Sequence, residues 1–217
     1  MSEAVPWAAG ELEGLAFAAS ALAPFFLEDP ATGQAAPSFA AMAALSVDEA
    51  ADQWPFATPD EARPALARMH EGLAAGAGDE ALAREYRRLF VGPQALPAPP
   101  WGSVYTDRDS IMFGESTLAL RAWMRAHGVA RTSDARTPED HIGLMLALAA
   151  YVAEVRPELT DELLRDHVLT WAPHYLGLLE EAAAHPFYQG LARLTGATLQ
   201  GVQASRGLEV VRPRYYR

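Results

Sequence analysis

The chain has 217 residues, of which 50% are hydrophobic and 21% charged, so it is long enough for one or two globular domains and too apolar to be disordered throughout. It has no cysteine and all 17 of its basic residues are arginine, which excludes disulfides, thiolate nucleophiles, iron–sulfur clusters and any mechanism that needs a lysine. Its formal net charge of −11 opposes binding to nucleic acid or to anionic membranes and favours a cationic partner.

The first residues of the chain are acidic and lack the basic region of a secretory signal peptide. The longest uncharged apolar runs, residues 14–27 and 142–153, fall short of the roughly 18 residues that a membrane-spanning helix needs. Pro24 also interrupts the first of them. We therefore expect a soluble protein that stays in the cytoplasm.

Alanine, the strongest helix former, is abundant along the chain, and the alternating pattern of β-strands is nearly absent. Two start signals, at residues 58–61 and 137–140, combine an N-cap threonine, a proline and a capping-box acid. We expect an all-α protein in which residues 1–217 form a single domain. Helices are predicted over residues 7–26, 38–44, a short segment after 46, 59–76, 80–91, 115–127, 139–155, 161–169, 174–184 and 186–204.

Residues 91–105 differ from the rest, with four prolines, two glycines and two large aromatic residues in fifteen positions. Proline excludes a helix and holds the backbone extended, so we expect a stiff loop that contains no helix. The loop carries no charge, and Asp107, Asp109 and Glu115 follow it. It could simply wrap the core, or it could form a peptide-binding groove. An apolar floor rimmed by carboxylates would suit a ligand that is part apolar and part arginine.

Two histidine-containing patterns were candidates for chemistry. A metal site would need His167, His174 and a carboxylate such as Glu162 to converge, but no zinc-binding spacing supports it, so we expect no metal and no cofactor. From the residues alone, Asp140 is interpreted as the capping-box acid that bonds back to Thr137. His141 would then lie in the first helical turn, where the helix dipole favours a neutral ring.

Several motifs together resemble one known family. They are Glu-Tyr-x-Arg-Leu-Phe-Val-Gly-Pro at 85–93, Leu-Pro-Ala-Pro-Pro-Trp-Gly-Ser-Val-Tyr at 96–105, Phe-Gly-Glu-Ser-Thr-Leu at 113–118, Pro-Glu-Asp-His at 138–141 and His-Pro-Phe-Tyr at 185–188. The set resembles the TorD/DmsD family of redox-enzyme maturation chaperones, closest to its DmsD branch. The resemblance runs from about residue 53 to the end of the sequence.

This resemblance implies an all-helical, TorD-like chaperone of the cytoplasm that is not an enzyme. Such proteins bind the twin-arginine leader of a molybdenum-cofactor oxidoreductase subunit and delay its export until the cofactor is inserted. The export machinery is a further expected partner, nucleic acid is not, and monomer and domain-swapped dimer stay open. The alternatives are a nucleotide or metal-dependent hydrolase and a general helical scaffold.

The resemblance also implies where the leader binds. It points to Leu89, Pro100, Trp101, Gly102, Tyr105, Gly114, Pro138, Asp140 and His141. Ser103 in the same loop and the acids Glu115 and Glu139 complete the candidate site. We expect the apolar part of the leader on Trp101, Tyr105 and Leu89, and its arginines against Glu115, Glu139 or Asp140. Close relatives often carry tryptophan where this chain has Gln94 and Tyr105.

Overall fold

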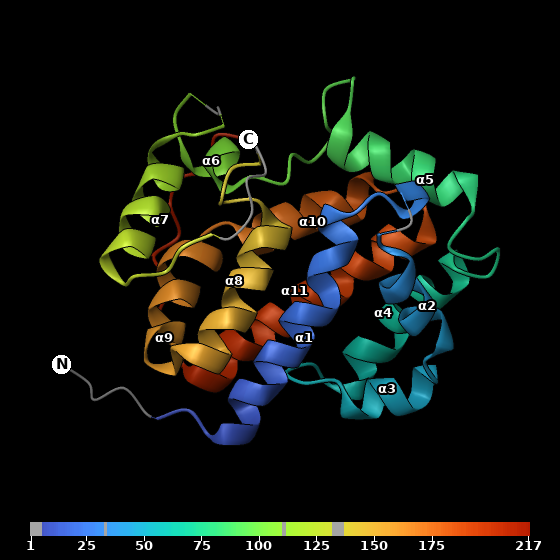
Figure 1. Ribbon diagram of the computed structural model, residues 1–217, viewed down its shortest axis with the longest axis horizontal. Coiled ribbons are helices and arrows are strands. Elements are labelled where there is room, and N and C mark those ends of the chain that lie inside the picture. The colour runs from blue at the N-terminus through green and yellow to red at the C-terminus, as the bar shows by residue number, and fades with distance from the viewer. Residues whose placement is uncertain (1–5, 33, 110–111, 132–136) are drawn as a thin grey trace.

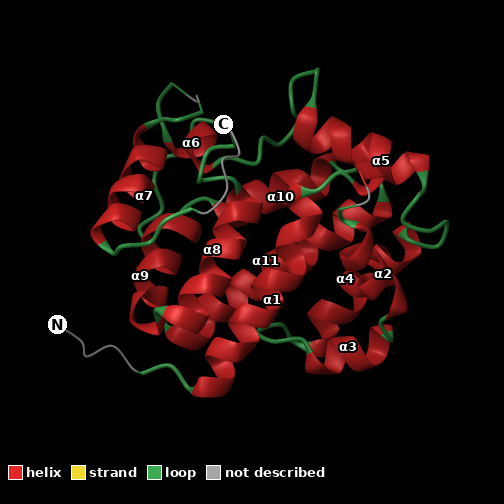
Figure 2. Cartoon of the chain, viewed as in Figure 1, coloured by secondary structure: helices red, strands yellow, loops and turns green. Residues whose placement is uncertain are grey.

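The computed structural model describes residues 6–32, 34–109, 112–131 and 137–217, and within these ranges the regular structure is helical (Figures 1 and 2). This confirms the expected all-α class. The helices are α1 (Ala9–Leu27), α2 (Ala36–Ala44), α3 (Val47–Gln53), α4 (Pro59–Gly72), α5 (Glu80–Tyr86), α6 (Gly102–Thr106), α7 (Glu115–Ala126), α8 (Ile142–Val155), α9 (Thr160–Leu163), α10 (Ala172–Ala182) and α11 (Pro186–Arg206). Turns of π-helix, Arg87–Val91 and Leu164–Val168, extend α5 and α9.

Local capping signals position some of these helices as the sequence predicts. Thr58 and Glu61 form the expected capping box at the start of α4, and the carboxylate of Asp79 accepts from Ala81 N–H at the start of α5. Gly128, at φ +66°, follows the end of α7. The prediction that α4 continues to about residue 76 is wrong. It ends at Gly72, where the start of α11 approaches so closely that a Cβ would lie 2.5 Å from the Phe187 nitrogen.

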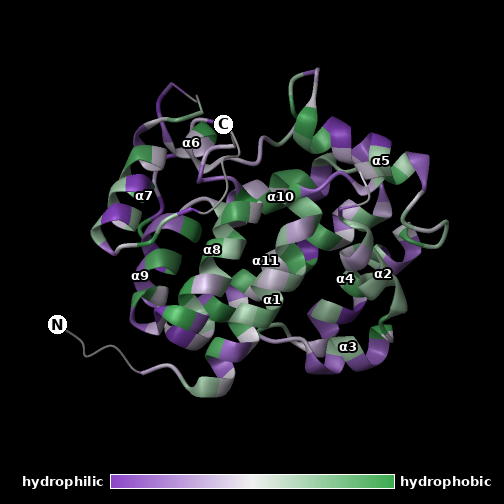
Figure 3. Cartoon of the chain, viewed as in Figure 1, coloured by the Kyte–Doolittle hydropathy of each residue, from purple (hydrophilic) through white to green (hydrophobic). Residues whose placement is uncertain are grey.

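The core lies between α1, α8 and α11, which cross near the middle of the molecule, with α4 packed along α11 (Figure 1). Phe25, Phe39 and Phe187 meet there, with ring centroids 4.9–5.1 Å apart. Figure 3 colours α8 mainly green and white, in agreement with its predicted place as the most apolar helix, whereas α7 shows purple on its outer side. One buried cluster includes residues from α1 to α11. The single-domain organisation stays a prediction.

The apolar helix α1 lies close to the predicted range of residues 7–26, and Pro24 lies inside it. The buried side chains of Phe25 and Phe26 hold this last turn against the core. By length and composition alone α1 could cross a membrane, so the expectation that no segment is long enough was wrong. In the structure 44% of its most apolar window is buried, and α1 packs along α8.

Two sequence motifs far apart in the chain meet at a buried carboxylate. Glu85 accepts two hydrogen bonds from Arg88 at 2.7 and 2.8 Å, and also accepts from the backbone nitrogens of Ala184 (2.6 Å) and His185 (3.3 Å). Burial alone would raise the pKa of Glu85, but the hydrogen bonds from Arg88 and Ala184 bring it below the ordinary value. His185 in turn caps α11 by accepting from Phe187 N–H. The cluster therefore fastens α5 to the turn between α10 and α11.

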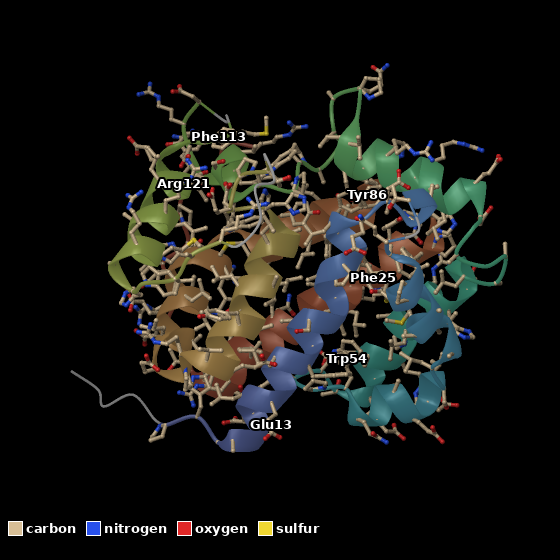
Figure 4. All side chains as sticks on the ribbon, viewed as in Figure 1. Glu13, Phe25, Trp54, Tyr86, Phe113 and Arg121 are labelled. Atoms are coloured by element: carbon tan, nitrogen blue, oxygen red, sulfur yellow. The ribbon has the colours of Figure 1, made fainter. Side chains whose placement is uncertain are left out.

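Other contacts fasten α3 and α1 to the far end of α11. The Trp54 indole nitrogen donates to the Thr198 hydroxyl at 2.9 Å, and its ring lies 5.9 Å from that of Phe17 on α1 (Figure 4). The helices α6, α7 and α9 lie on the side of the molecule away from α2 to α5 (Figure 1). This is the side that carries the candidate site.

The Glu85 cluster predicts a test of stability. Glu85→Gln should lower the free energy of unfolding by about 2 kcal/mol, because it removes a buried charge that accepts four hydrogen bonds. The matched control is Glu180→Gln, which weakens a more exposed pair with Arg193 and should cost less than about 0.5 kcal/mol. Urea denaturation followed by circular dichroism measures both, and equal losses would contradict the role given to Glu85.

Candidate functional site

The stiff loop and the turn before α8 pair with each other as two short antiparallel segments. Ile142 N–H donates to the carbonyl oxygen of Pro100 at 2.8 Å, and Gly102 N–H donates to that of Asp140 at 3.1 Å. Trp101 and His141 form an isolated antiparallel bridge between these bonds, and their rings meet edge to face at 5.7 Å. Segments separated by about forty positions in the sequence, including five of the predicted site residues, are thus brought together.

Asp140 anchors this pairing with its side chain. Its Oδ2 accepts from Ser103 N–H at 2.8 Å, in the first turn of α6, while its buried Oδ1 has no hydrogen-bond partner among the residues that the structure describes. The capping-box interpretation of Asp140 is therefore wrong: α8 begins at Ile142, and the carboxylate caps a helix from another part of the chain. The expectation of a helix-free loop up to residue 105 is also wrong, because α6 begins at Gly102 once the last proline has passed.

His141 caps α8 directly. Its Nδ1 accepts from Gly143 N–H at 3.1 Å, and the residue is only 4% exposed. Burial, assisted by the positive charge of Arg131, lowers the pKa of His141 to about 3. The ring is therefore neutral at physiological pH, as expected, although it lies at the N-cap and not in the first turn. It acts here as a hydrogen-bond acceptor and a ring partner for Trp101.

The predicted apolar docking residues differ strongly in exposure. Leu89 and Tyr105 are both fully buried, so in this structure they pack beneath the loop and offer no surface to a ligand. The Tyr105 hydroxyl donates to the Pro99 carbonyl at 2.8 Å, which helps to keep the loop stiff. Trp101 is partly exposed, and its buried indole N–H has no hydrogen-bond partner in the described part of the chain. Trp101 is thus the residue of the three with surface left to contact a ligand.

The two glycines of the predicted site lie in close contact with neighbouring side chains. At Gly102 a Cβ would lie 2.7 Å from the Trp171 indole nitrogen, and at Gly114 it would lie 1.8 Å from a carboxylate oxygen of Asp107. Asp107 accepts from Ser116 N–H at 3.3 Å and so caps α7. Both glycines therefore allow the elements around the site to pack closely.

The three acids expected to meet the leader arginines are in different states. Glu115 is exposed in the first turn of α7. Glu139 already accepts from Arg121 at 2.7 Å, and Arg121 also lies 5.2 Å over the ring of Phe113 (Figure 4). Asp140 has one buried oxygen without a partner. Of the three, Asp140 would be stabilised most by a cationic ligand, because a buried acceptor without a donor lowers the stability of the folded protein.

A pocket of about 230 Å³ lies next to this carboxylate. Its lining combines two acids, a histidine and apolar side chains from α6, α7, the turn after α9 and the chain after α11. The lining residues are Gly102, Thr106, Ser116, Ala119, Leu120, Asp140, Asp166, His167, Thr170, Trp171, Val211 and Pro213. Burial lowers the pKa of His167, so this ring adds no positive charge at neutral pH. The pocket suits a small cationic group with apolar surroundings.

A second hollow lies on the other side of the same turn. This apolar groove, about 380 Å³, runs between α7 and α8 and is lined by Met124, Val129, Ala130, Arg131, Glu139, Leu144, Ala147, Leu148 and Tyr151. Because Glu139 lines the groove and Asp140 lines the pocket, the two hollows flank the segment 138–141. A ligand with a cationic part followed by an apolar part could occupy both.

Sequence reasoning missed part of the pocket. Asp166 and Trp171 were not considered as ligand contacts, and His167 only as a metal ligand, because their approach to Asp140 depends on helix packing.

The residues considered as a metal site, His167, His174 and Glu162, are not brought together. His174 stacks on Tyr215, and Glu162 faces His127. Among the described residues, no three His, Asp or Glu side chains are close enough to hold a metal ion.

The neutral state of His141 makes stability depend on pH. In the unfolded chain its pKa would be near 6.5, so between that value and about 3 the unfolded state binds one more proton than the folded state. The stability that comes from keeping His141 neutral in the folded state is fully present above pH 6.5 and is lost as the pH falls.

His141→Asn keeps an N-cap acceptor but does not titrate. Between pH 7 and pH 5 the wild type should lose about 2 kcal/mol more unfolding free energy than the variant. Equal losses in urea denaturation at the two pH values would contradict a buried neutral ring.

Comparisons with known proteins identify the family of this chain. The family described as Nitrate reductase delta subunit matches residues 57–176. The Tat proofreading chaperone DmsD of Salmonella typhi is 40% identical over 193 residues, which cover 88% of this chain and 90% of the relative. The probable Tat proofreading chaperone DmsD of Haemophilus influenzae is 49% identical over 136 residues, covering 63% and 67%. The chaperone protein TorD of Vibrio cholerae is more distant, at 30% over 131 residues, covering 55% and 59%. The chain therefore belongs to the nitrate reductase delta subunit family, which includes the TorD and DmsD chaperones it resembles in sequence.

Proposed function

We propose that this protein is a Tat proofreading chaperone of the cytoplasm. It binds the twin-arginine leader of a molybdoenzyme catalytic subunit and holds the subunit back from export until folding and cofactor insertion are complete. It is not an enzyme. The family and the relatives at 40–49% identity support this role. The observation that carries it for this chain is the buried Asp140 carboxylate, with one unpartnered oxygen, beside a pocket of suitable size.

The cationic part of the leader binds at the pocket. A guanidinium can form charge-assisted hydrogen bonds with two acceptors at once, which suits a wall that contains both Asp140 and Asp166. Asp166 pairs with Arg165 at an exposed position, where such a pair is weak and easily exchanged. The net charge of −11 also draws a cationic peptide toward the chain.

The apolar part of the leader binds to the exposed face of Trp101 and the groove between α7 and α8. Leu89 and Tyr105 act indirectly, since their buried side chains fix the loop that presents Trp101. A stiff loop loses little conformational entropy when a peptide binds to it. This division of roles refines the expectation that all three side chains contact the leader.

Two further points stay predictions. Contact with the export machinery, and the choice between monomer and domain-swapped dimer, need direct measurement by pull-down and by light scattering. For the hydrolase alternative, the described residues contain no group of three His, Asp or Glu side chains that could hold a metal ion. A general scaffold is the other alternative, and it would bind its partners regardless of the two leader arginines.

Asp140→Asn should weaken leader binding by about tenfold or more, because it removes the charge of the pair while an oxygen remains to cap α6. Fluorescence polarisation with synthetic twin-arginine leaders measures the affinity. Glu115→Gln, an exposed acid of the same candidate site, is the matched control and should change it by less than about threefold. If the two variants bind alike, Asp140 is not the arginine partner.

Trp101→Ala should reduce leader binding by more than about tenfold while the helical circular dichroism spectrum is retained. Its indole N–H has no hydrogen-bond partner, so the truncation leaves no acceptor unpaired. Phe17→Ala on α1, a side chain that is 58% exposed, controls for general loss of apolar surface. Wild-type affinity in the Trp101 variant would overturn the docking role of this residue.

A further inference from the structure

Two phenylalanines have a backbone conformation that large side chains rarely adopt. Among the described residues other than glycine, only Phe56 (φ +63°) and Phe113 (φ +65°) have a positive φ angle. In this left-handed region Cβ comes too close to a backbone carbonyl oxygen, so a bulky residue stays there only when its surroundings hold it. The packing around each phenylalanine shows whether the fold alone accounts for its conformation.

At Phe56 the fold does account for the strain. Helix α11 passes so close that a Cβ at Gly201 would lie 1.5 Å from the Phe56 carbonyl oxygen. The Phe56 ring packs against the core and meets the Trp7 ring edge to face, with centroids 6.4 Å apart. The close approach of α11 and the packing of the ring together stabilise this conformation.

At Phe113 no comparable packing is present. The ring is 46% exposed, lies outside the buried core and meets no other aromatic ring in the part of the chain that the structure describes. Arg121 lies over the ring at 5.2 Å, and the two side chains lie near each other on α7 and the turn before it (Figure 4). Burial therefore does not offset the strain at Phe113, and strained residues of this kind cluster at binding sites.

Phe113 lies beside the proposed leader site. Its ring partner Arg121 donates to Glu139, which lines the groove between α7 and α8. Ser116, three positions after Phe113 in the chain, lines the pocket that contains Asp140. The ring is thus placed close to the turn between the two hollows. A leader with its arginines in the pocket and its apolar part in the groove crosses this turn with the residues that join the two parts.

We propose that Phe113 is a specificity-determining contact of the leader, and that its ring binds the first large apolar side chain after the arginines. Arg121 covers part of the ring, and the exposed remainder offers an apolar surface. Leu118, also exposed, lies one helical turn before Arg121 on the same face of α7 and adds to this surface. The inference rests on the proposed function, because it assumes that the leader binds at this site.

A double-mutant cycle between Phe113 and the leader tests the contact. The probes are a synthetic leader with an arginine pair followed by an apolar stretch, and the same peptide with alanine in place of its first large apolar residue. Fluorescence polarisation measures their affinities for wild-type protein and Phe113→Ala. The variant should bind the unaltered leader about fivefold more weakly and the alanine leader almost as wild type does, as expected for one lost apolar contact. Equal losses for both peptides would overturn the contact.

Phe113→Gly separates binding from folding. Glycine adopts a positive φ without strain, so this variant should melt within about 3 °C of wild type or above it, while it binds the leader as weakly as Phe113→Ala does. Phe17→Ala is the matched control, since Phe17 is an exposed phenylalanine of α1, and it should leave the affinity within about twofold of wild type. A melting temperature of Phe113→Gly more than about 3 °C below wild type would make the ring a support of the fold and overturn the proposal.

The outcomes distinguish this inference from the function on which it rests. If wild-type protein binds no leader, the proposed function and the role of Phe113 are both overturned. If Asp140→Asn weakens binding as expected but both Phe113 variants bind like wild type, the leader site stands and only the role of Phe113 is overturned.

Discussion

A carboxylate buried between two loops sets the geometry of the site. Asp140 is 4% exposed, and a charged group in such a place must be hydrogen-bonded if the fold is to be stable. One of its oxygens meets this requirement by capping α6, which fixes the position of the segment from Trp101 to Tyr105. The other oxygen is left unpaired at the edge of a pocket. Asp140 therefore holds the loops together through one oxygen. Its other oxygen lacks a hydrogen-bond donor among the described residues, and a guanidinium can supply one.

The surroundings of Asp140 make this arrangement rigid. The prolines of the loop restrict its backbone, the Tyr105 hydroxyl fastens Pro99, and Gly102 lets the Trp171 indole pack directly against α6. Neutral His141 caps α8 without adding a positive charge beside the carboxylate. A preformed site of this kind can bind a flexible peptide while only the peptide loses entropy.

Local patterns in the sequence predicted most helices but not the role of Asp140. Residues 58–61 and 137–140 carry the same start signal, yet only the first forms a capping box, in which Thr58 N–H donates to Glu61 at 2.9 Å. In the second, the carboxylate is drawn to Ser103, 37 positions away, and no local pattern reports that contact. The same limit hid Asp166 and Trp171, which reach the pocket through helix packing. The motif resemblance named residues on both sides of this long-range pairing, which local patterns could not do, and their role in binding a leader stays a prediction.

The central claim is that a leader arginine pairs with Asp140, and a double-mutant cycle tests it most directly. Leader peptides with the arginine pair or with two glutamines in its place are titrated against wild-type protein and Asp140→Asn. If the charges interact, loss of the arginines should weaken binding to wild type by about tenfold and have almost no effect in the variant. Equal losses in both proteins would show that the arginines bind elsewhere, and would contradict this account of the site.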